Sequence, residues 1–318
     1  MTAPLLRRLA APAAALLAAA ALAGCSSSSS SGNPLAGSQP TGSIVVGSDN
    51  FAESVLLADV YGQALAAKGY KVSYKLDIGS REVTYGLVKT GAITLKPEYN
   101  GALLSYLDTL RKTTTPQTST SQVDAAITKE LDSGLEILSP STAQDNDTLT
   151  LSKSEASALH LSDGATISQF ITALNGQSIT IGSSPEFQTR YQGLVGLEQA
   201  YGLNASQVTY KSLDAGGPLT EAALTSGQVQ AGDLFTTDPT IKQGGLVTLV
   251  DNKGIFGVQD VLPLIYKKDL GQTGVDALNA VDAKLTSAGL LSMDTQVQVD
   301  KTDPATVAKQ WLSSEGLG

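Results

Sequence analysis

Strand-like and helix-like hydrophobic patterns alternate in the first half of the chain. Residues 43–46 form a short β-branched run that predicts a buried strand, and turn residues follow at 47–50. Apolar residues then recur at helical spacing until Gly69, which predicts a helix. Asn50 and Glu53 have the spacing of a capping box, so we expect this helix to begin at Asn50.

The alternation continues through a second and a third strand. Residues 71–77 alternate polar with apolar side chains, residues 79–91 have the pattern of a helix, and residues 92–99 form a third strand. Alternating strands and helices predict parallel strands with right-handed crossovers, and such sheets bind ligands outside the carboxyl ends of their strands. The residues at those ends are Ser48, Asp49, Asn50, Gly79, Ser80, Arg81, Glu98 and Tyr99.

Strands and helices continue along the rest of the chain, interrupted by two polar, turn-forming joints at residues 139–147 and 251–260. An alternating strand of similar type follows each joint, at 148–152 and 261–265, which predicts two α/β units. Further strands are expected at 136–138, 178–182, 208–213, 229–235 and 247–250, and helices at 102–110, 122–131, 154–161, 167–174, 192–201, 219–225, 275–287, around Thr295 and at 304–314.

Several short motifs follow one another in order along the chain. They are Gly47-Ser48-x-Asn50-Phe51-x-Glu53-Ser54, Ile78-Gly79-Ser80-Arg81-Glu82-Val83, Pro97-Glu98-Tyr99-x-Gly101, Pro185-Glu186-Phe187-x-x-Arg190, Gly193-Leu194-x-Gly196-Leu197, Tyr201-Gly202 and Phe235-Thr236-Thr237-Asp238. In this order they resemble the substrate-binding proteins of ABC importers for glycine betaine, choline and related osmolytes. The resemblance covers nearly all of the chain after residue 42.

The resemblance implies an α/β fold of the type II periplasmic-binding-protein class, with two Rossmann-like lobes, a ligand cleft and two hinge crossings. Lobe one would comprise residues 43–143 and 255–318, and lobe two residues 144–254. It also implies an extracytoplasmic receptor that binds a small osmolyte between its lobes and delivers it to the permease subunits of an ABC importer, without catalysis. We expect a monomer that uses no cofactor and no metal.

The first 42 residues predict export and anchoring. Arg7 and Arg8 precede an uncharged run rich in Ala and Leu, which fits a secretory signal over residues 1–24. The small residues before Cys25 fit a lipoprotein signal, in which Cys25 would be acylated; the alternative is an ordinary signal with an incidental cysteine. The Ser-rich residues 26–42 would then tether the folded part to a membrane.

The acidic composition excludes nucleic acid as a partner. The formal net charge is −9, and loss of Arg7 and Arg8 with the signal segment would make it −11. No run of Lys or Arg is long enough to reverse this negative charge locally. His160 is the only histidine and Cys25 the only cysteine, so we expect neither a zinc cluster nor a Cys-His catalytic pair. A two-lobed enzyme such as porphobilinogen deaminase needs a cysteine that the folded part lacks; a surface adhesion or structural lipoprotein stays open.

A quaternary ammonium ligand would need aromatic faces or a nearby carboxylate, because it has no N–H to donate. Tyr99 is the first candidate, since the resemblance places a cage aromatic in its motif, although a packing tyrosine is the alternative. Phe51 either lines the cleft or packs into the core. Asp49 either neutralises a cationic ligand or is an exposed residue at a helix N-terminus.

A ligand carboxylate would need donors instead. Arg81 and Arg190 each lie at a predicted loop–helix junction, where a guanidinium either grips a carboxylate or forms a structural ion pair. Asn146 in the first joint would hydrogen-bond a polar ligand. Hydroxyl partners from both lobes are expected at Ser80, Ser183, Thr236 and Thr237.

The sequence departs from its choline-binding relatives at two positions. Thr148 and Gln259 stand where the resemblance leads us to expect cage tyrosines, so only Tyr99 is kept. The expected ligand is therefore an osmolyte such as glycine betaine, choline or proline betaine, with a non-quaternary polar solute as the alternative.

Overall fold

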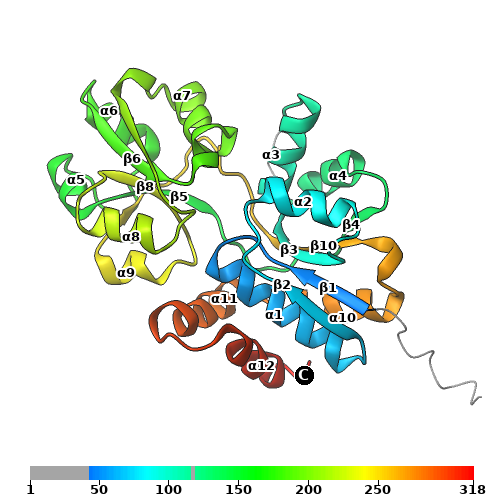
Figure 1. The fold of residues 1–318 in the computed structure, drawn as a ribbon. Helices are drawn as coiled ribbons and strands as arrows, with labels where there is room; N and C mark the ends of the chain where they lie inside the picture. Colours follow the sequence, from blue (N-terminus) through cyan, green and yellow to red (C-terminus); the bar gives the residue numbers. More distant parts are fainter. Residues whose placement is uncertain (1–42, 116–118) are drawn as a thin grey trace, which may run out of the picture. The chain divides into compact units, whose positions relative to one another are not determined.

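The computed structural model describes residues 43–115 and 119–318, which contain two five-stranded sheets (Figure 1). The predicted signal segment, Cys25 and the tether lie outside the described residues. The first sheet has the strand order β2-β1-β3-β10-β4 and the second the order β7-β6-β8-β5-β9. The strands are β1 (Ser43–Gly47), β2 (Lys71–Lys75), β3 (Leu95–Tyr99), β4 (Leu135–Ile137), β5 (Asp147–Leu151), β6 (Ile179–Ser183), β7 (Val208–Ser212), β8 (Ala231–Phe235), β9 (Val247–Thr248) and β10 (Val261–Tyr266).

The helices lie close to their predicted places. They are α1 (Ala52–Ala67), α2 (Arg81–Lys89), α3 (Asn100–Arg111), α4 (Thr120–Glu130), α5 (Lys153–Ala158), α6 (Ile167–Leu174), α7 (Gly196–Tyr201), α8 (Pro218–Thr225), α9 (Pro239–Gly244), α10 (Gln272–Asp282), α11 (Ser287–Asp294) and α12 (Pro304–Ser314). Short 3-10 or π-helical turns are η1 (Pro185–Gln188), η2 (Tyr191–Val195), η3 (Ala205–Gln207), η4 (Lys267–Asp269) and η5 (Thr295–Val299). Helix α9 was not predicted.

Helices cover both faces of the first sheet. α1, α10 and α12 pack together on one face, with Leu56 and Leu278 in their shared core, while α2, α3 and α4 bury Leu103 and Val123 against the other. In Figure 1 these two sets lie on opposite sides of the sheet. In the second sheet, α6 and α7 share one buried core and α8 contributes to another.

Each sheet combines parallel with antiparallel strands. β1 runs parallel to β2 and β3, and β6 parallel to β7 and β8, as predicted. Outside the stretch for which parallel strands were predicted, β10 is antiparallel to β3 and β4, and β5 is antiparallel to β8 and β9. β5 and β10 are the strands that follow the two passages between the sheets, so each enters its sheet from the opposite end.

The two passages between the sheets run side by side. The chain crosses between β4 and β5 and returns between β9 and β10. The backbone N–H of Asp145 donates to the carbonyl of Gln259 at 3.1 Å, and that of Val261 donates to Ala143 at 3.0 Å. Two hydrogen-bonded extended segments thus connect the sheets, an arrangement that suits a hinge.

The predicted capping box at Asn50 and Glu53 is wrong. Helix α1 starts at Ala52, and Phe51 precedes it in an extended conformation without a side-chain cap. The carboxyl group of Glu53 instead accepts hydrogen bonds from Tyr99 and Thr237 in the interior. Tertiary contacts therefore override a spacing that would otherwise favour a local cap.

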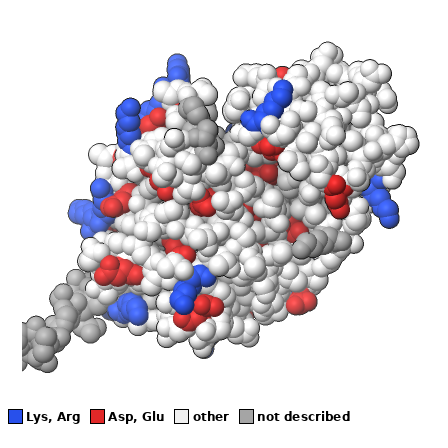
Figure 2. Space-filling view, turned by 180° about the vertical axis from the view of Figure 1, so that it is seen from behind, with Lys and Arg blue, Asp and Glu red and all other residues white. Residues whose placement is uncertain are grey.

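Charged groups are scattered over the surface. Figure 2 shows Asp and Glu spread over one face of the molecule, with Lys and Arg standing singly or in small groups. On this face the described residues form no extended basic patch.

Candidate functional site

A cavity of about 270 Å³ opens between residues of the two sheets and of the passages that join them. It is lined by loops at the carboxyl ends of β1 and β3, where the sequence predicted a site, and by the ends of β5, β6 and β8. The predicted residues that line it are Asp49, Asn50, Phe51, Ser80, Arg81, Tyr99 and Arg190.

The other predicted residues do not line the cavity. Glu98 is buried as the partner of Arg81, and Ser183 donates a hydrogen bond to Asp233 at 3.2 Å. The side-chain amide of Asn146 donates to the carbonyl of Gly257 at 2.9 Å, which ties one passage to the other. Thr236 accepts a hydrogen bond from the backbone of Asn146, and Thr237 belongs to a buried carboxyl cluster described below.

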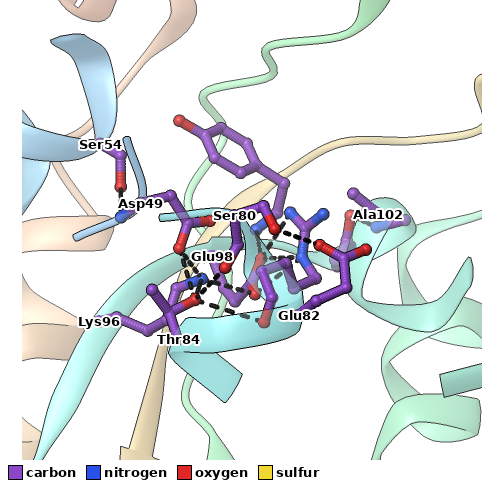
Figure 3. Close-up of polar contacts among 12 residues, drawn as sticks. Asp49, Ser54, Ser80, Glu82, Thr84, Lys96, Glu98 and Ala102 are labelled. Atoms are coloured by element: carbon purple, nitrogen blue, oxygen red, sulfur yellow. Dashed lines mark hydrogen bonds and ion pairs between the residues drawn. The ribbon is translucent and has the colours of Figure 1, made fainter. Parts of the chain in front are cut away.

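A buried ionic network supports the base of the cavity (Figure 3). Nε and Nη2 of Arg81 hold both carboxylate oxygens of Glu98 at 2.9–3.0 Å. Nζ of Lys96 lies 2.6 Å from Oδ1 of Asp49 and 3.0 Å from Oε1 of Glu98, and it also contacts Thr84. The charge of Asp49 is thus already paired inside the protein, which leaves little of it to neutralise a cationic ligand.

This network keeps Glu98 and Arg81 charged. Burial alone would raise the pKa of Glu98, but the charges of Arg81 and Lys96 hold that pKa at about 2. Burial lowers the pKa of Arg81, yet Glu98 raises it further, so the guanidinium stays charged. Nη1 of Arg81 makes no hydrogen bond with the described residues, and it remains available to an anionic group in the cavity.

An aromatic wall lines another part of the cavity. The ring of Phe51 packs between those of Tyr99 and Phe235, with centroid distances of 6.0 and 5.7 Å and tilts of 36° and 33°. Phe187 also lines the cavity. The sequence analysis named Phe51 and Tyr99 as site residues but not Phe187 and Phe235, although both belong to the motifs that carried the family resemblance.

Two carboxyl groups from neighbouring strands line the cavity and were not predicted. Asp147 begins β5 and Asp233 lies on β8. Burial raises the pKa of Asp147 to about 6, although Arg190 and Arg81 oppose this. Burial and then the charge of Asp147 raise the pKa of Asp233 well above its ordinary value. The pair therefore keeps one proton near neutral pH.

The segment from η1 to η2 depends on two glycines. A side chain at Gly193 would lie 2.2 Å from the carbonyl oxygen of Phe187, and one at Gly196 would lie 2.1 Å from that of Tyr191. Only glycine allows this close backbone approach. The predicted helix over residues 192–201 is therefore divided into η2 and α7, and the compact turn carries Phe187 to the cavity.

Arg190 forms an ion pair with a helix of the other sheet. Its Nη2 lies 2.8 and 3.1 Å from the carboxylate oxygens of Glu82 on α2, which also accepts a hydrogen bond from Ser80. Burial would raise the pKa of Glu82, but Ser80 and Arg190 hold it at about 2. The structural ion pair expected as an alternative for Arg190 is thus present, and its exposure limits its contribution to stability to about 0–1 kcal/mol.

A carboxyl cluster lies buried where the passages meet α1. Tyr99 donates to Glu53, and the hydroxyl of Thr237 lies 2.7 Å from both Glu53 and Asp145. Burial raises the pKa of Glu53 and of Asp145 well above their ordinary values. Burial also raises the pKa of Asp294 to about 7, and neither of its oxygens meets a donor. Glu53 and Asp145 are therefore joined through Thr237, which links α1 to the loop after β8.

We expect Asp294→Asn to stabilise the protein by about 1–3 kcal/mol at pH 8, because it removes a buried carboxylate without donors. The folded-state pKa of Asp294 is raised, so its contribution is favourable below the unfolded value of 3.8 and is lost as pH rises through about 7. Urea unfolding at pH 4, 6 and 8 measures this. Asp300→Asn, at an exposed position, is the control, and a pH-independent gain for Asp294→Asn would contradict the argument.

Comparison with known proteins identifies the family. Residues 42–314 match the family described as the substrate binding domain of ABC-type glycine betaine transport systems. The chain belongs to this family. It is 27% identical to the glycine betaine-binding protein YehZ of Escherichia coli, over 89% of this chain and 93% of the relative. It is 26% identical to a glycine-betaine-binding protein of Pseudomonas aeruginosa, over 89% of this chain and 91% of that one.

Solved structures show the same fold. A glycine betaine/carnitine/choline ABC transporter protein matches with a TM-score of 0.66 at 15% identity, covering 86% of this chain and 99% of its own. A choline binding protein in complex with choline matches with a TM-score of 0.58 at 15% identity, covering 86% and 89%. The expected two-lobed α/β fold is therefore confirmed, with one sheet in each lobe.

Membership of the family also gives the chain its general role. Substrate-binding proteins of ABC importers are extracytoplasmic and work with the permease components of the importer. Among residues 43–115 and 119–318, no helix combines the length and apolar character needed to cross a membrane. The same residues contain no cluster of three His, Cys, Asp or Glu side chains arranged to hold a metal ion.

The two positions without cage tyrosines differ in location. Gln259 lines the cavity, where its Oε1 accepts a hydrogen bond from the backbone of Ala102 and its Nε2 donates to Phe256. Thr148 is buried on β5 and does not line the cavity. Both polar groups of the Gln259 amide are thus used within the protein, and neither position offers an aromatic face to a ligand.

Proposed function

We propose that this chain binds a small osmolyte of the glycine betaine and choline class in the cavity between its lobes and delivers it to the permease. One observation carries the proposal: the Phe51 ring, packed between Tyr99 and Phe235, shares the cavity with Asp147 and Asp233, which form no ion pair with a Lys or Arg of the described residues. Aromatic faces and carboxylates are the groups that attract an organic cation.

The ligand's two ends would meet different walls. The cationic head lies against the rings of Phe51, Tyr99 and Phe235, close to the carboxyl groups of the second sheet. A carboxylate, where the ligand has one, accepts from Nη1 of Arg81, because Nε and Nη2 are held by Glu98. Asn50, Ser80 and the backbone at the start of α2 complete the polar contacts.

The role in transport leads to further proposals about the lobes, the hinge and the membrane anchor. Lobe one comprises residues 43–143 and 255–318, lobe two comprises 144–254, and the hydrogen-bonded passages act as the hinge on which the lobes close. The protein is a monomer without catalytic activity or cofactor, held at the outer surface of the membrane by a lipid on Cys25. The cavity supports the proposed lack of catalytic activity: it contains no Ser-His or Cys-His arrangement, since the only histidine, His160, does not line it.

Calorimetric titration with glycine betaine and choline tests the proposal. We expect at least one of them to bind with micromolar affinity. In Tyr99→Ala this affinity should fall by about 5- to 30-fold, because a desolvated cation–π contact contributes about 1–2 kcal/mol. Tyr99→Phe keeps the ring and loses only the hydrogen bond to Glu53, so it should stay close to the wild-type affinity. A folded protein that binds neither compound, or a Tyr99→Ala variant with unchanged affinity, would overturn the proposal.

A non-quaternary polar solute is the second candidate ligand. The carboxyl groups of Asp147 and Asp233 favour it, because they offer acceptors that a fully methylated nitrogen cannot use. The presence of Thr148 and Gln259 in place of tyrosines favours it as well. Without those tyrosines, the aromatic side chains are confined to one wall of the cavity.

A further inference from the structure

We propose that Asp147 and Asp233 select ligands whose cationic group carries N–H donors, such as ammonium, amidinium or guanidinium groups, over ligands whose nitrogen is fully methylated. The inference rests on the proposed function of the cavity as the ligand site. It concerns which member of the broader class of small organic cations binds most tightly.

Strand register places the two carboxyl groups on one face of the second sheet. In the antiparallel pair of β5 and β8, Asp147 is opposite Phe235 and Leu149 is opposite Asp233. Opposite residues share a face, and so do residues two apart along a strand, so the two aspartates are diagonal neighbours. Both line the cavity, next to the aromatic wall at Phe235.

The described protein residues leave these acceptors largely without donors. Asp233 is 3% exposed; its Oδ2 accepts a hydrogen bond from Ser183, while its Oδ1 is buried with no partner. No side-chain donor of the described residues bonds to Asp147, and no Lys or Arg lies within ion-pair distance of either carboxyl group.

The nearest guanidinium groups are already engaged elsewhere. Arg190 pairs with Glu82, and Arg81 pairs with Glu98, so both act on Asp147 only at longer range. The two carboxyl groups are close enough to interact, since the charge of Asp147 raises the pKa of Asp233. Asp147, which lines the cavity, can therefore accept hydrogen bonds from a ligand cation with N–H groups.

A quaternary ammonium group would satisfy the charge but not the hydrogen bonds. Its methyl groups carry no conventional donor, so the carboxyl group of Asp147, which lines the cavity and receives no side-chain donor from the described residues, would gain no hydrogen bond from the bound ligand. An N–H cation supplies the missing donors and forms charge-assisted hydrogen bonds, which are about twice as strong as neutral ones. Its carbon atoms can still pack against Phe51 and Phe235.

Matched ligands that differ by a single methyl group test the inference. The pairs are choline with N,N-dimethylethanolamine, and glycine betaine with dimethylglycine, each titrated into the protein by calorimetry at pH 7.5. We expect the N–H member of each pair to bind at least about tenfold more tightly, because leaving a buried hydrogen-bond acceptor without a donor weakens binding by about this factor.

Two variants locate the preference. Asp147→Asn keeps the shape of the side chain but replaces one acceptor with a donor, so the ratio within each pair should fall to about one. Glu186→Gln also removes one carboxylate from the cavity wall, yet it leaves the aspartate pair intact and should keep the ratio. Thermal unfolding of both variants confirms that they are folded.

Each outcome decides between the two proposals. If the quaternary member binds as tightly as its N–H partner or more tightly, the selection is overturned and the proposed osmolyte function stands. If Asp147→Asn retains the N–H preference, the assignment to this pair is overturned. If the folded protein binds no member of either pair, both the selection and the proposed function fail.

Discussion

Lys96→Met is expected to destabilise the protein by about 3–5 kcal/mol, the range found when one partner of a buried ion pair is removed. Lys96 is fully buried on β3, and its ammonium group contacts Asp49, Glu98 and Thr84. Methionine has a similar volume, so the loss comes from the charge and hydrogen bonds rather than from a cavity. Arg81 would still balance Glu98, but Asp49 would remain as a buried carboxylate without a cation.

Urea unfolding of Lys96→Met is compared with that of Lys89→Met. Lys89 forms an ion pair with Asp132 at 3.1 Å, but its side chain is 53% exposed, so its loss should change stability by less than about 1 kcal/mol. Equal effects of the two substitutions would show that burial of the Lys96 network contributes nothing to the free energy of unfolding. Circular dichroism of both variants establishes that the comparison is between folded proteins.

The role of Lys96 was not accessible to sequence patterns. Lys96 and Glu98 alternate with Leu95 and Tyr99, a pattern that normally places the polar face of a strand in solvent. Every residue of β3 is buried instead, because α2 covers that face and supplies Thr84 to the network. The partners are distant in sequence, so only the fold reveals them.

Local periodicity predicted the first sheet well. The strands and helices from β1 to β3 follow clear twofold and helical patterns, and Asp49, Arg81 and Tyr99, which the rule places at the carboxyl ends of the strands, line the cavity. This rule works because parallel strands end at one edge of the sheet. It needs no knowledge of long-range contacts.

The same rule missed Asp147, since periodicity does not reveal the direction of a strand. β5 runs antiparallel to β8, so its amino end lies at the edge where β6 and β8 have their carboxyl ends. Asp147 at the start of β5 therefore meets Asp233 near the end of β8. A search confined to the carboxyl ends of strands excludes Asp147, and it therefore leaves Asp233 without its partner.

Ligand affinity is expected to fall by up to about tenfold per pH unit below pH 6, and to be constant above about pH 7. A bound cation requires a negative charge on the aspartate pair. Burial raises the pKa of Asp147 to about 6, against the opposing charges of Arg190 and Arg81, so protons compete with the ligand below this value. Asp233, whose pKa is raised well above its ordinary value by burial and by Asp147, keeps its proton through this range.

Calorimetry with choline at pH 5, 6, 7 and 8 measures this competition, because choline itself keeps a constant charge over the range. Titrations in two buffers with different ionisation enthalpies should reveal proton release on binding near pH 6 and little at pH 8. Asp147→Asn should remove both the pH step and the proton release, whereas Glu186→Gln should retain them. Equal wild-type affinities at pH 5 and 7 would mean that the charge of the aspartate pair does not hold the ligand, and the cation would then depend on the aromatic wall of Phe51, Tyr99 and Phe235 alone.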